Sequence, residues 1–506
     1  MGVEFGSTRI KSVIADGTGK CYAAGEYVWE NRLENGLWTY SEADIWRGLR
    51  GSFADLCKNY GGKPELSGIG LSGMMHGYIA LDGNGKLLVP FRTWRNTNTG
   101  EAAEALTRLF GVNIPMRWSI AHLYQSILNG EEHVKEIACL TTLSGYVHYK
   151  LTGEKVLGIG DASGMFPIDP ETGTYDERML SAFDKLTAGK GYPWKLKEIL
   201  PKVLKSGEEA GKLTEDGAKL LDAAGGLRPG IGLCPPEGDA GTGMVATDSV
   251  EERRGNVSAG TSVFAMVVLE KPLSRLHTEI DAVTTPDGKP VAMVHCNNCT
   301  SDINAWAKLF QEVLHTFGKE VTPGELMTRL FEKSTESESA GGLTNYNYFS
   351  GEPVAGLTEG RPLFLREADG ALSLADFMKA QIYSAVAGLA LGMEILREED
   401  VRIDEMCGHG GFFKTPEIGQ SVMSAAVNAP VTVSEHAGEG GAWGIALLAA
   451  YMVEGKGRTL SEFLSGIFVG SRKTTLSANE KERRGFADFL VRYKRYLAAE
   501  KAAAEA

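Results

Sequence analysis

The feature that most constrains this chain is a motif that occurs twice, about half the sequence apart. The segment VEFGSTRIKSVIAD begins at Val3, and VSAGTSVFAMVVLE begins at Val257. Both read Val-x-x-Gly-[Ser/Thr]-[Ser/Thr], followed by a β-rich run that ends in an acid. A second pair, GLSGMMHG at 70–77 and MCGHGGFF at 406–413, also joins an apolar run to glycines. Chance similarity of small residues is the alternative. We favour duplication, which predicts two similar halves whose phosphate-type turns face one another and close on a nucleotide.

Local patterns predict the elements of the first half. TRIKSVIAD (8–16) and KCYAAGEYVW (20–29) read as consecutive strands joined by a turn. The segment 41–60 carries apolar residues at helical spacing after Ser41, a favourable N-cap residue. Strands followed by a helix and a further apolar strand predict a mixed α/β domain. In the second half, DFMKAQIYSAVAGLALGMEIL predicts a helix, and the C-terminal AAEKAAAEA has nothing to bury and is expected to fray.

Composition narrows the class of protein. A chain of 506 residues predicts two to four domains. The formal net charge of −13 argues against a broad nucleic-acid-binding surface. The longest apolar stretch of the chain, GIALLAAYMV from Gly444, is about half as long as a membrane span. The N-terminus lacks the pattern of a signal peptide. We therefore expect a cytoplasmic protein with no membrane partner.

Three short patterns indicate what the chain is not. Cys296 and Cys299 form a lone CxxC, which we interpret as structural, with zinc or redox chemistry as the alternative. The segment 351–358 has the glycine spacing of a Walker loop, but Leu357 stands where lysine is needed. The glycines of 68–73 straddle an apolar strand instead of following it, so we reject a Rossmann site.

Two segments carry residues suited to phosphate chemistry. The turn Gly6-Ser7-Thr8 follows Glu4 by two residues, so its backbone N–H groups and hydroxyls can cradle phosphate while the acid holds a metal. The alternative is an ordinary hairpin. Asp239 lies between small residues that let a substrate approach closely, and its carboxylate can accept a proton from an attacking alcohol. The alternative for Asp239 is a surface turn.

Further residues are candidates for ligand contact. Met75 and His76 stand at a strand end, where His76 suits a hydroxylated ligand, although a structural histidine is the alternative. Trp94 and Trp306 can stack on a sugar, or belong to the core. The glycine strings at 408–411 and 435–450 can let a flat base lie against bare backbone, or serve helix packing.

Taken in order, these segments resemble the FGGY family of carbohydrate kinases over nearly the whole chain. GVEFGSTRIK resembles the first phosphate motif, GLSGMMHG the sugar segment, and EGDAGTGMVAT the segment with the catalytic aspartate. SAGTSVFAMV resembles the second phosphate motif, and CGHGGFFKTPEIGQSVMSAAVNAPV the adenosine motif. The segment 149–176 also resembles the sequence that the family has in this region.

The resemblance implies an actin-like, ribonuclease-H-like α/β fold with duplicated βββαβα domains and a cleft between two lobes. The sugar-binding lobe would be 1–246 and the nucleotide-binding lobe 247–506. It implies ATP and Mg²⁺ as cofactors, Asp239 as the base that deprotonates the sugar, and Glu4 with Asp239 at the metal. The implied sugar contacts are Met75, His76, Trp94, Asn96 and Asp239, and the implied nucleotide contacts are Gly6, Ser7, Thr8, Lys11, Gly260, Thr261, Ser262, Gly408, Gly410 and Gly411.

Departures from the family pattern concern the substrate. Glu4 stands where the family usually has aspartate, Met74 where xylulokinases have glutamine, and Asn96 and Asn98 where charged residues are common. D-xylulose is the first candidate for the sugar, and another ketose or polyol is the alternative. A nucleotide-binding sensor without transfer activity is the alternative from another class. Two lobes predict a monomer or a homodimer.

Overall fold

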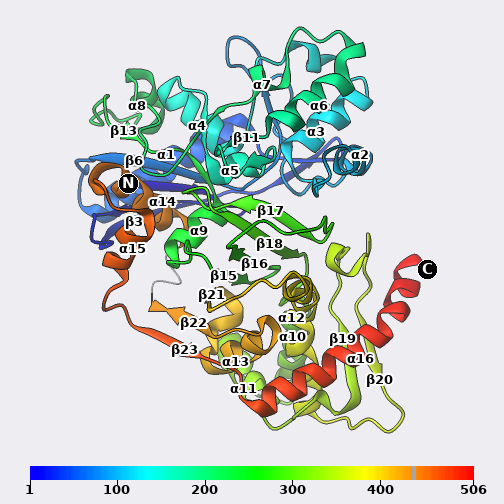
Figure 1. The fold of residues 1–506 in the computed structure, drawn as a ribbon. Coiled ribbons are helices and arrows are strands. Elements are labelled where there is room, and N and C mark those ends of the chain that lie inside the picture. Colours follow the sequence, from blue (N-terminus) through cyan, green and yellow to red (C-terminus); the bar gives the residue numbers. More distant parts are fainter. Residues whose placement is uncertain (436–439) are drawn as a thin grey trace. The chain divides into compact units, whose positions relative to one another are not determined.

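The computed structural model describes residues 1–435 and 440–506, and its chain divides into two compact units. Each unit has both helices and strands (Figure 1). The division of the sequence at residue 246 stays a prediction. No helix in the described ranges is long and apolar enough to cross a membrane. The first unit comprises Met1–Glu251, Arg275–Val291 and Glu439–Gly470, and the second comprises Glu252–Ser274, Ala292–Gly438 and Ser471–Ala506.

The sheet of the first unit contains the predicted hairpin at one edge. Its strands run in the order β3 (Cys21–Val28), β2 (Arg9–Ala15), β1 (Gly2–Phe5), β6 (Gly68–Gly73), with β13 (Gly232–Leu233) and β14 (Glu237–Gly238) both beside β6. β1 is antiparallel to β2 and parallel to β6, and β6 is parallel to β14. The predicted strands at 8–16 and 20–29 are confirmed as β2 and β3.

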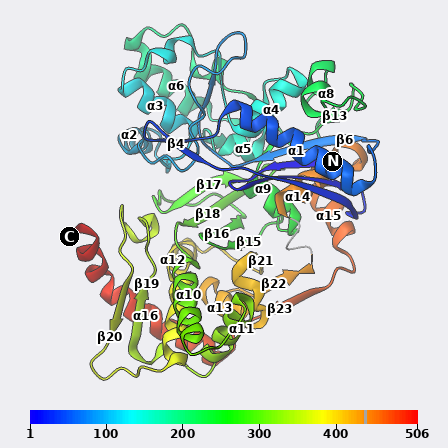
Figure 2. The same cartoon turned by 180° about the vertical axis from the view of Figure 1, so that it is seen from behind.

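Helices cover both faces of this sheet. α1 (Glu42–Tyr60) begins after Ser41, whose hydroxyl accepts the Asp44 N–H, and its buried residues pack onto β2 and β3 (Figure 2). The predicted helix and its N-cap are therefore confirmed. α14 (Gly440–Glu454) packs on β1 and β6. A Cβ at Gly2 would collide with the α14 backbone, and one at Gly70 would lie 2.6 Å from the Ile445 oxygen, so both strands need glycine there.

The second unit repeats this strand order. Its sheet runs β18 (Pro290–Cys296), β16 (Val263–Val268), β15 (Arg254–Ala259), β21 (Glu405–His409), β22 (Val431–Ser434), β23 (Lys473–Leu476). β15 is antiparallel to β16 and parallel to β21, as β1 is to β2 and β6. The duplicated actin-like topology is thereby confirmed. The predicted long helix is also confirmed, as α12 (Leu374–Glu398).

The remaining elements complete the two units. In the first they are β4 (Arg32–Glu34), β5 (Leu37–Thr39), β7 (Ile79–Leu81), α2 (Gly100–Phe110), α3 (Ser119–Leu128), η1 (Glu132–Glu136), β8 (Cys139–Thr141), α4 (Leu143–Thr152), β9 (Val156–Gly158), α5 (Ile159–Ser163), β10 (Ile168–Asp169), β11 (Thr174–Tyr175), α6 (Glu177–Thr187), η2 (Ala188–Lys190), α7 (Leu196–Ile199), β12 (Lys202–Leu204), α8 (Glu215–Leu221), α9 (Asp239–Ala246), β17 (Ile280–Thr284) and α15 (Leu460–Phe468). In the second they are α10 (Ser301–Thr316), α11 (Pro323–Ser334), η3 (Ala340–Gly342), β19 (Leu343–Tyr346), η4 (Pro353–Ala355), β20 (Leu363–Arg366), η5 (Gly411–Lys414), α13 (Pro416–Val427) and α16 (Glu480–Glu505).

The expectation that the C-terminal residues fray is wrong. α16 continues to Glu505, and Glu500 near its end is fully buried. The Glu500 carboxylate accepts the backbone N–H of Arg361 at 2.8 Å. A buried carboxylate that receives a backbone donor ties the last helical turns to the body of the second unit.

Candidate active site

Three remote segments of the first unit meet at one edge of its sheet. β1, β6 and β14 are parallel neighbours, and Phe5, Gly73 and Gly238 at their carboxyl ends are in register. Carboxyl ends of parallel strands share an edge of the sheet, which is where open α/β sheets bind ligands. The turn Gly6-Ser7-Thr8, the segment Met74–His76 and Asp239 directly follow these strand ends. The structure therefore brings these predicted residues together.

Asp239 is the first residue of α9, immediately after β14. Its Oδ1 accepts the backbone N–H groups of Ala240 at 2.9 Å and Met75 at 3.2 Å. In the described part of the chain, no group donates a hydrogen bond to Oδ2. Burial raises the pKa of Asp239 above its usual value, against the effect of these backbone donors. Asp239 thus presents one carboxylate oxygen with its proton affinity increased.

Glu4 is the second carboxylate at this edge. It pairs in register with Lys11 on β2 and Ser72 on β6, and its Oε2 accepts the Ala442 N–H of α14 at 3.2 Å. A Cβ on Gly441 would lie 2.5 Å from Oε1, so α14 approaches this carboxylate through a glycine. Burial, and next the negative charge of Asp239, raise the pKa of Glu4 to about 7.

The pair Glu4 and Asp239 fits a magnesium ion. Two carboxylates that disfavour each other's charge gain from a divalent cation between them. Mg²⁺ uses one or two protein carboxylates and retains several waters. Within residues 1–435 and 440–506, no group of three or more His, Cys, Asp or Glu side chains is placed to hold a metal. The two carboxylates therefore suit a hydrated ion.

The first glycine turn is anchored through its carbonyl groups. Trp29 Nε1 donates to the Gly6 oxygen at 2.7 Å, and Tyr40 donates to the Ser7 oxygen at 2.6 Å. The two aromatic rings stack with centroids 4.0 Å apart. Among the residues that the structure describes, no acceptor takes the N–H groups of Ser7 and Thr8. These donors are the kind that a phosphate group requires.

Sequence reasoning missed two buried carboxyl groups beside Asp239. Glu237 accepts the backbone N–H groups of Gly160 at 3.3 Å and Asp161 at 2.9 Å, and burial raises its pKa to about 8. Asp161 accepts the hydroxyls of Thr142 and Ser144, and burial raises its pKa to about 7. Burial therefore favours the protonated form of both groups. The only signal in the sequence was the position of Glu237 two residues before Asp239.

His76 and Met75 lie next to Asp239. His76 has the left-handed backbone conformation, with φ of 70°, which is strained for a non-glycine residue and is found at ligand sites. Its Nδ1–H donates to the Gly164 oxygen at 3.0 Å, and its ring stacks on Trp118. The Met75 side chain packs against Gly238 and Gly164. Sugar contact by either residue stays a prediction.

Two other predicted sugar contacts are engaged elsewhere. Trp94 is half-buried against the main core of the first unit. The Asn96 amide donates to the carbonyls of Trp38 and Thr93 and accepts the Trp38 N–H at 2.8 Å. Both amide hydrogens are thus used to hold the backbone, so we leave Asn96 out of the proposed sugar site. Trp306, in the second unit, packs edge-on against Phe377.

The second unit has a corresponding edge. The turn Gly260-Thr261-Ser262 joins β15 to β16, and Ser258 of β15 is in register with His409 of β21. The turn therefore lies near Gly408, Gly410 and Gly411. Gly410 has φ of 102°, and a Cβ there would collide with the Ala259 backbone. In the other predicted glycine string, residues 436–439 lie outside the described residues.

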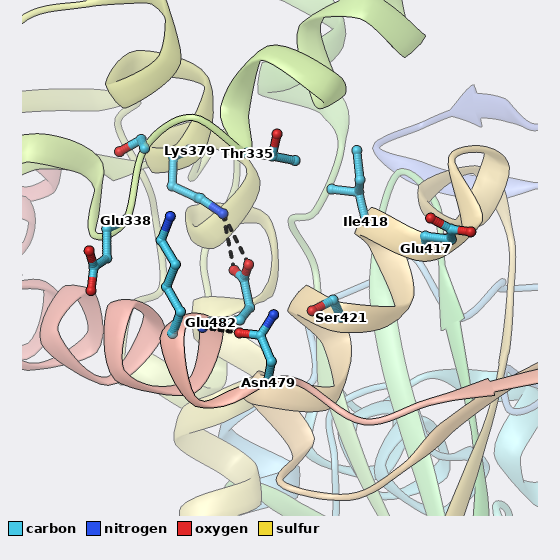
Figure 3. Close-up of a pocket in the computed structure, with 10 residues that line it drawn as sticks. Thr335, Glu338, Lys379, Glu417, Ile418, Ser421, Asn479 and Glu482 are labelled. Atoms are coloured by element: carbon cyan, nitrogen blue, oxygen red, sulfur yellow. Dashed lines mark hydrogen bonds and ion pairs between the residues drawn. The ribbon is translucent and has the colours of Figure 1, made fainter.

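A polar pocket of about 300 Å³ lies elsewhere in the second unit (Figure 3). Lys379 is buried there and binds Glu482 at 3.1 Å, so the charges of these two groups are already balanced. None of the predicted site residues lines the pocket. Its lining residues are Thr335, Ser337, Glu338, Lys379, Glu417, Ile418, Ser421, Asn479, Lys481 and Glu482.

Comparisons with known proteins agree with the topology and with the motif order. The N-terminal domain model of the FGGY family of carbohydrate kinases matches residues 1–241, and the C-terminal domain model matches 255–453. A xylulose kinase from Haemophilus influenzae is 22% identical over 493 residues, 93% of each chain. A ligand-bound xylulose kinase from Lactobacillus acidophilus superposes with a TM-score of 0.82 at 18% identity, over 99% of each chain. A gluconate kinase from the same organism gives 0.81 at 18% identity, over 100% of this chain and 98% of the other. The chain belongs to the FGGY family of carbohydrate kinases.

Proposed function

We propose that this protein transfers the γ-phosphate of ATP to a hydroxyl of a small sugar, with D-xylulose, giving xylulose 5-phosphate, as the first candidate. The observation that carries the proposal is the arrangement at the edge of the first sheet. There Asp239 has an open carboxylate oxygen beside Glu4 and near a turn with two available N–H donors. The names of the relatives, with family membership, support sugar phosphorylation.

Each residue at this edge has a defined task in the proposal. Asp239 Oδ2 accepts the proton of the attacking sugar hydroxyl, and its raised pKa increases its strength as a base. Glu4 and Asp239 hold hydrated Mg²⁺, which when bound neutralises phosphate charge. The Ser7 and Thr8 N–H groups, with Lys11, hold phosphate oxygens. Positioning and charge stabilisation supply most of the rate enhancement in such reactions.

The second unit supplies the remaining proposed nucleotide contacts. Gly260, Thr261 and Ser262 form a turn of the same kind as Gly6-Ser7-Thr8. Gly408, Gly410 and Gly411 present bare backbone at the end of β21, which lets an adenosine group approach closely. These assignments derive from the family resemblance and are consistent with the positive φ of Gly410.

Other acceptors compete with D-xylulose. The structural similarity to a gluconate kinase equals that to a xylulose kinase, so the fold does not select the sugar. Met74, buried where xylulokinases have glutamine, favours an acceptor with one fewer polar group at that point. A sensor without transfer activity gains support only from Glu4, and the open Oδ2 of Asp239 argues against it.

ADP release with Mg-ATP, measured against a panel of ketoses, aldoses and polyols, tests the proposal. We expect D-xylulose to stimulate turnover well above the rate without sugar. If another sugar alone stimulated turnover, the proposed substrate would be wrong and the proposed kinase activity would stand. Failure of every sugar to stimulate, with ATP still bound, would contradict the proposed activity and favour the sensor.

A further inference from the structure

A fully buried carboxylate in the second unit holds a loop of the neighbouring sheet. Glu352 has no exposed surface and precedes η4. Its Oε1 accepts the Asn297 N–H at 3.3 Å. Its Oε2 accepts the Asn298 N–H at 3.3 Å and the Asn298 side-chain amide at 3.1 Å. Three donors on one buried carboxylate fix the loop, because a displaced donor would leave a buried polar group unsatisfied.

The segment around Glu352 strengthens this attachment. The Asn297 side chain donates to the Gly351 oxygen at 2.7 Å, and the Asn298 Oδ1 accepts the Phe349 N–H at 2.9 Å. Residues 349–352 and 297–298 therefore bind each other through both backbone and side chains. This segment contains the glycine spacing of 351–358 that lacked the lysine of a Walker loop.

The next two residues of the held loop bind the second glycine turn. The Cys299 N–H donates to the Thr261 oxygen at 2.9 Å. The Thr300 N–H and hydroxyl donate to the Gly260 oxygen at 3.0 and 2.7 Å. The carbonyl groups of Gly260 and Thr261 thus accept hydrogen bonds from the loop. In the described ranges, the N–H groups of Thr261 and Ser262 have no protein acceptor.

We propose that Glu352 is a positioning residue for nucleotide binding: it fixes the 297–300 loop, which holds the carbonyls of the Gly260-Thr261-Ser262 turn so that the turn's N–H groups stay available to phosphate. The proposal rests on the proposed function of that turn. A change at Glu352 therefore acts on nucleotide affinity and leaves the sugar site unaffected. Burial also raises the pKa of Glu352 to about 7, as expected for a carboxyl whose loss of solvation on burial is offset only by hydrogen bonds.

Glu352→Gln tests the inference, because the amide nitrogen of glutamine cannot accept one of the loop's N–H groups. Calorimetric titration of the full-length protein with ADP should give a Kd about tenfold higher, about 1.4 kcal/mol of binding free energy. In steady-state assays the KM for ATP should rise, while kcat and the KM for the sugar stay within twofold of wild type. Glu500→Gln is the matched control, since Glu500 is a fully buried carboxylate of the same unit that accepts a backbone N–H far from the turn in sequence.

Thr300→Val gives a second test if Glu352→Gln does not fold. It removes only the hydroxyl donor to Gly260 and should raise the ADP Kd about threefold. Unchanged ADP affinity in a folded Glu352→Gln protein, or an equal loss in Glu500→Gln, would overturn the positioning role. Wild-type protein that binds ADP but is stimulated by no sugar would refute the proposed activity and leave this inference testable by titration. Wild-type protein that binds no ADP would overturn both.

Discussion

Asp239→Asn separates the proposed base from the structure around it. Asparagine keeps an oxygen at the Oδ1 position, so the N–H groups of Met75 and Ala240 retain their acceptor and the start of α9 should not change. The amide nitrogen replaces Oδ2, the oxygen that accepts no hydrogen bond in the described residues and that the proposal uses for the sugar proton. The substitution therefore removes proton acceptance together with the negative charge that the proposal places beside Mg²⁺, so the assay is run at saturating Mg²⁺.

The expected loss follows from the environment of the carboxylate. Removing a general base costs about 10²–10⁴ in rate, or about 2.7–5.4 kcal/mol of transition-state stabilisation. Burial raises the pKa of Asp239 and makes it a stronger base than an exposed aspartate, so we expect about a 10³-fold fall in kcat. The KM values for sugar and ATP should change less than threefold.

The assay is sugar-stimulated ADP release by purified variants, with circular dichroism to confirm folding. Asp222→Asn is the matched control, because Asp222 is another buried carboxylate of the first unit that accepts backbone N–H groups and binds Lys63. It should keep kcat within twofold of wild type. If folded Asp239→Asn protein kept more than a tenth of the wild-type kcat, the assignment of the base would be wrong.

Three further predictions address other groups of the first unit. Gly441→Ala forces Glu4 to move and should raise the Mg²⁺ concentration for half-maximal activity about tenfold. Gly466→Ala, where a Cβ has open space, is the control and should not change this concentration. Equal effects of the two substitutions would refute the role of Glu4. Asn96→Ala should lower the free energy of unfolding by about 2 kcal/mol through three lost hydrogen bonds, and a large rise in the sugar KM without destabilisation would contradict the structural role. Glu237 has a folded-state pKa of about 8, above its unfolded value, so it stabilises the protein at low pH and this contribution falls as pH rises from about 5 to 8. In urea denaturation, the fall in unfolding free energy with pH should be smaller for Glu237→Gln than for wild type, by up to about 1.4 kcal/mol per pH unit, and parallel pH curves would refute the shift.

Local chemistry explains what the sequence could predict. The hairpin β2–β3 follows from alternation and a turn, and helix α1 follows from its apolar spacing and Ser41 as N-cap, all of which are local signals. The strand order of both units followed from the repeated motif and the family resemblance. Asp239 could be proposed as the base because its small neighbours and its motif are contiguous in sequence.

Long-range contacts explain what was missed. Glu237 is a buried carboxyl whose backbone donors, Gly160 and Asp161, are 77 and 76 residues away, and burial raises its pKa against the effect of these donors. Asn96 was expected at the sugar, yet its amide holds Trp38, 58 residues earlier. Glu500 orders the C-terminus through Arg361. In each case the partner that decides the role of a polar side chain has no signal in the residues beside it.

The two glycine turns show where the internal repeat ends. In both, carbonyl groups of the turn accept hydrogen bonds from elsewhere in the unit, and successive N–H groups have no protein acceptor in the described residues. A turn fixed in this way can offer donors to phosphate without reorganising, which is the cost that preorganised sites avoid.

The anchors, however, are different residues. The first turn is held by the stacked side chains of Trp29 and Tyr40 and by the Trp29 N–H, which donates to the Thr8 oxygen at 3.2 Å. The second is held by the backbone N–H groups of Cys299 and Thr300 and by the Thr300 hydroxyl, with Glu352 behind them. The motif therefore repeats at the backbone that can meet a ligand. It does not repeat where any donor of the right length can hold a carbonyl oxygen. For this reason the repeat in the sequence locates both turns, and only the structure identifies the residues that support them.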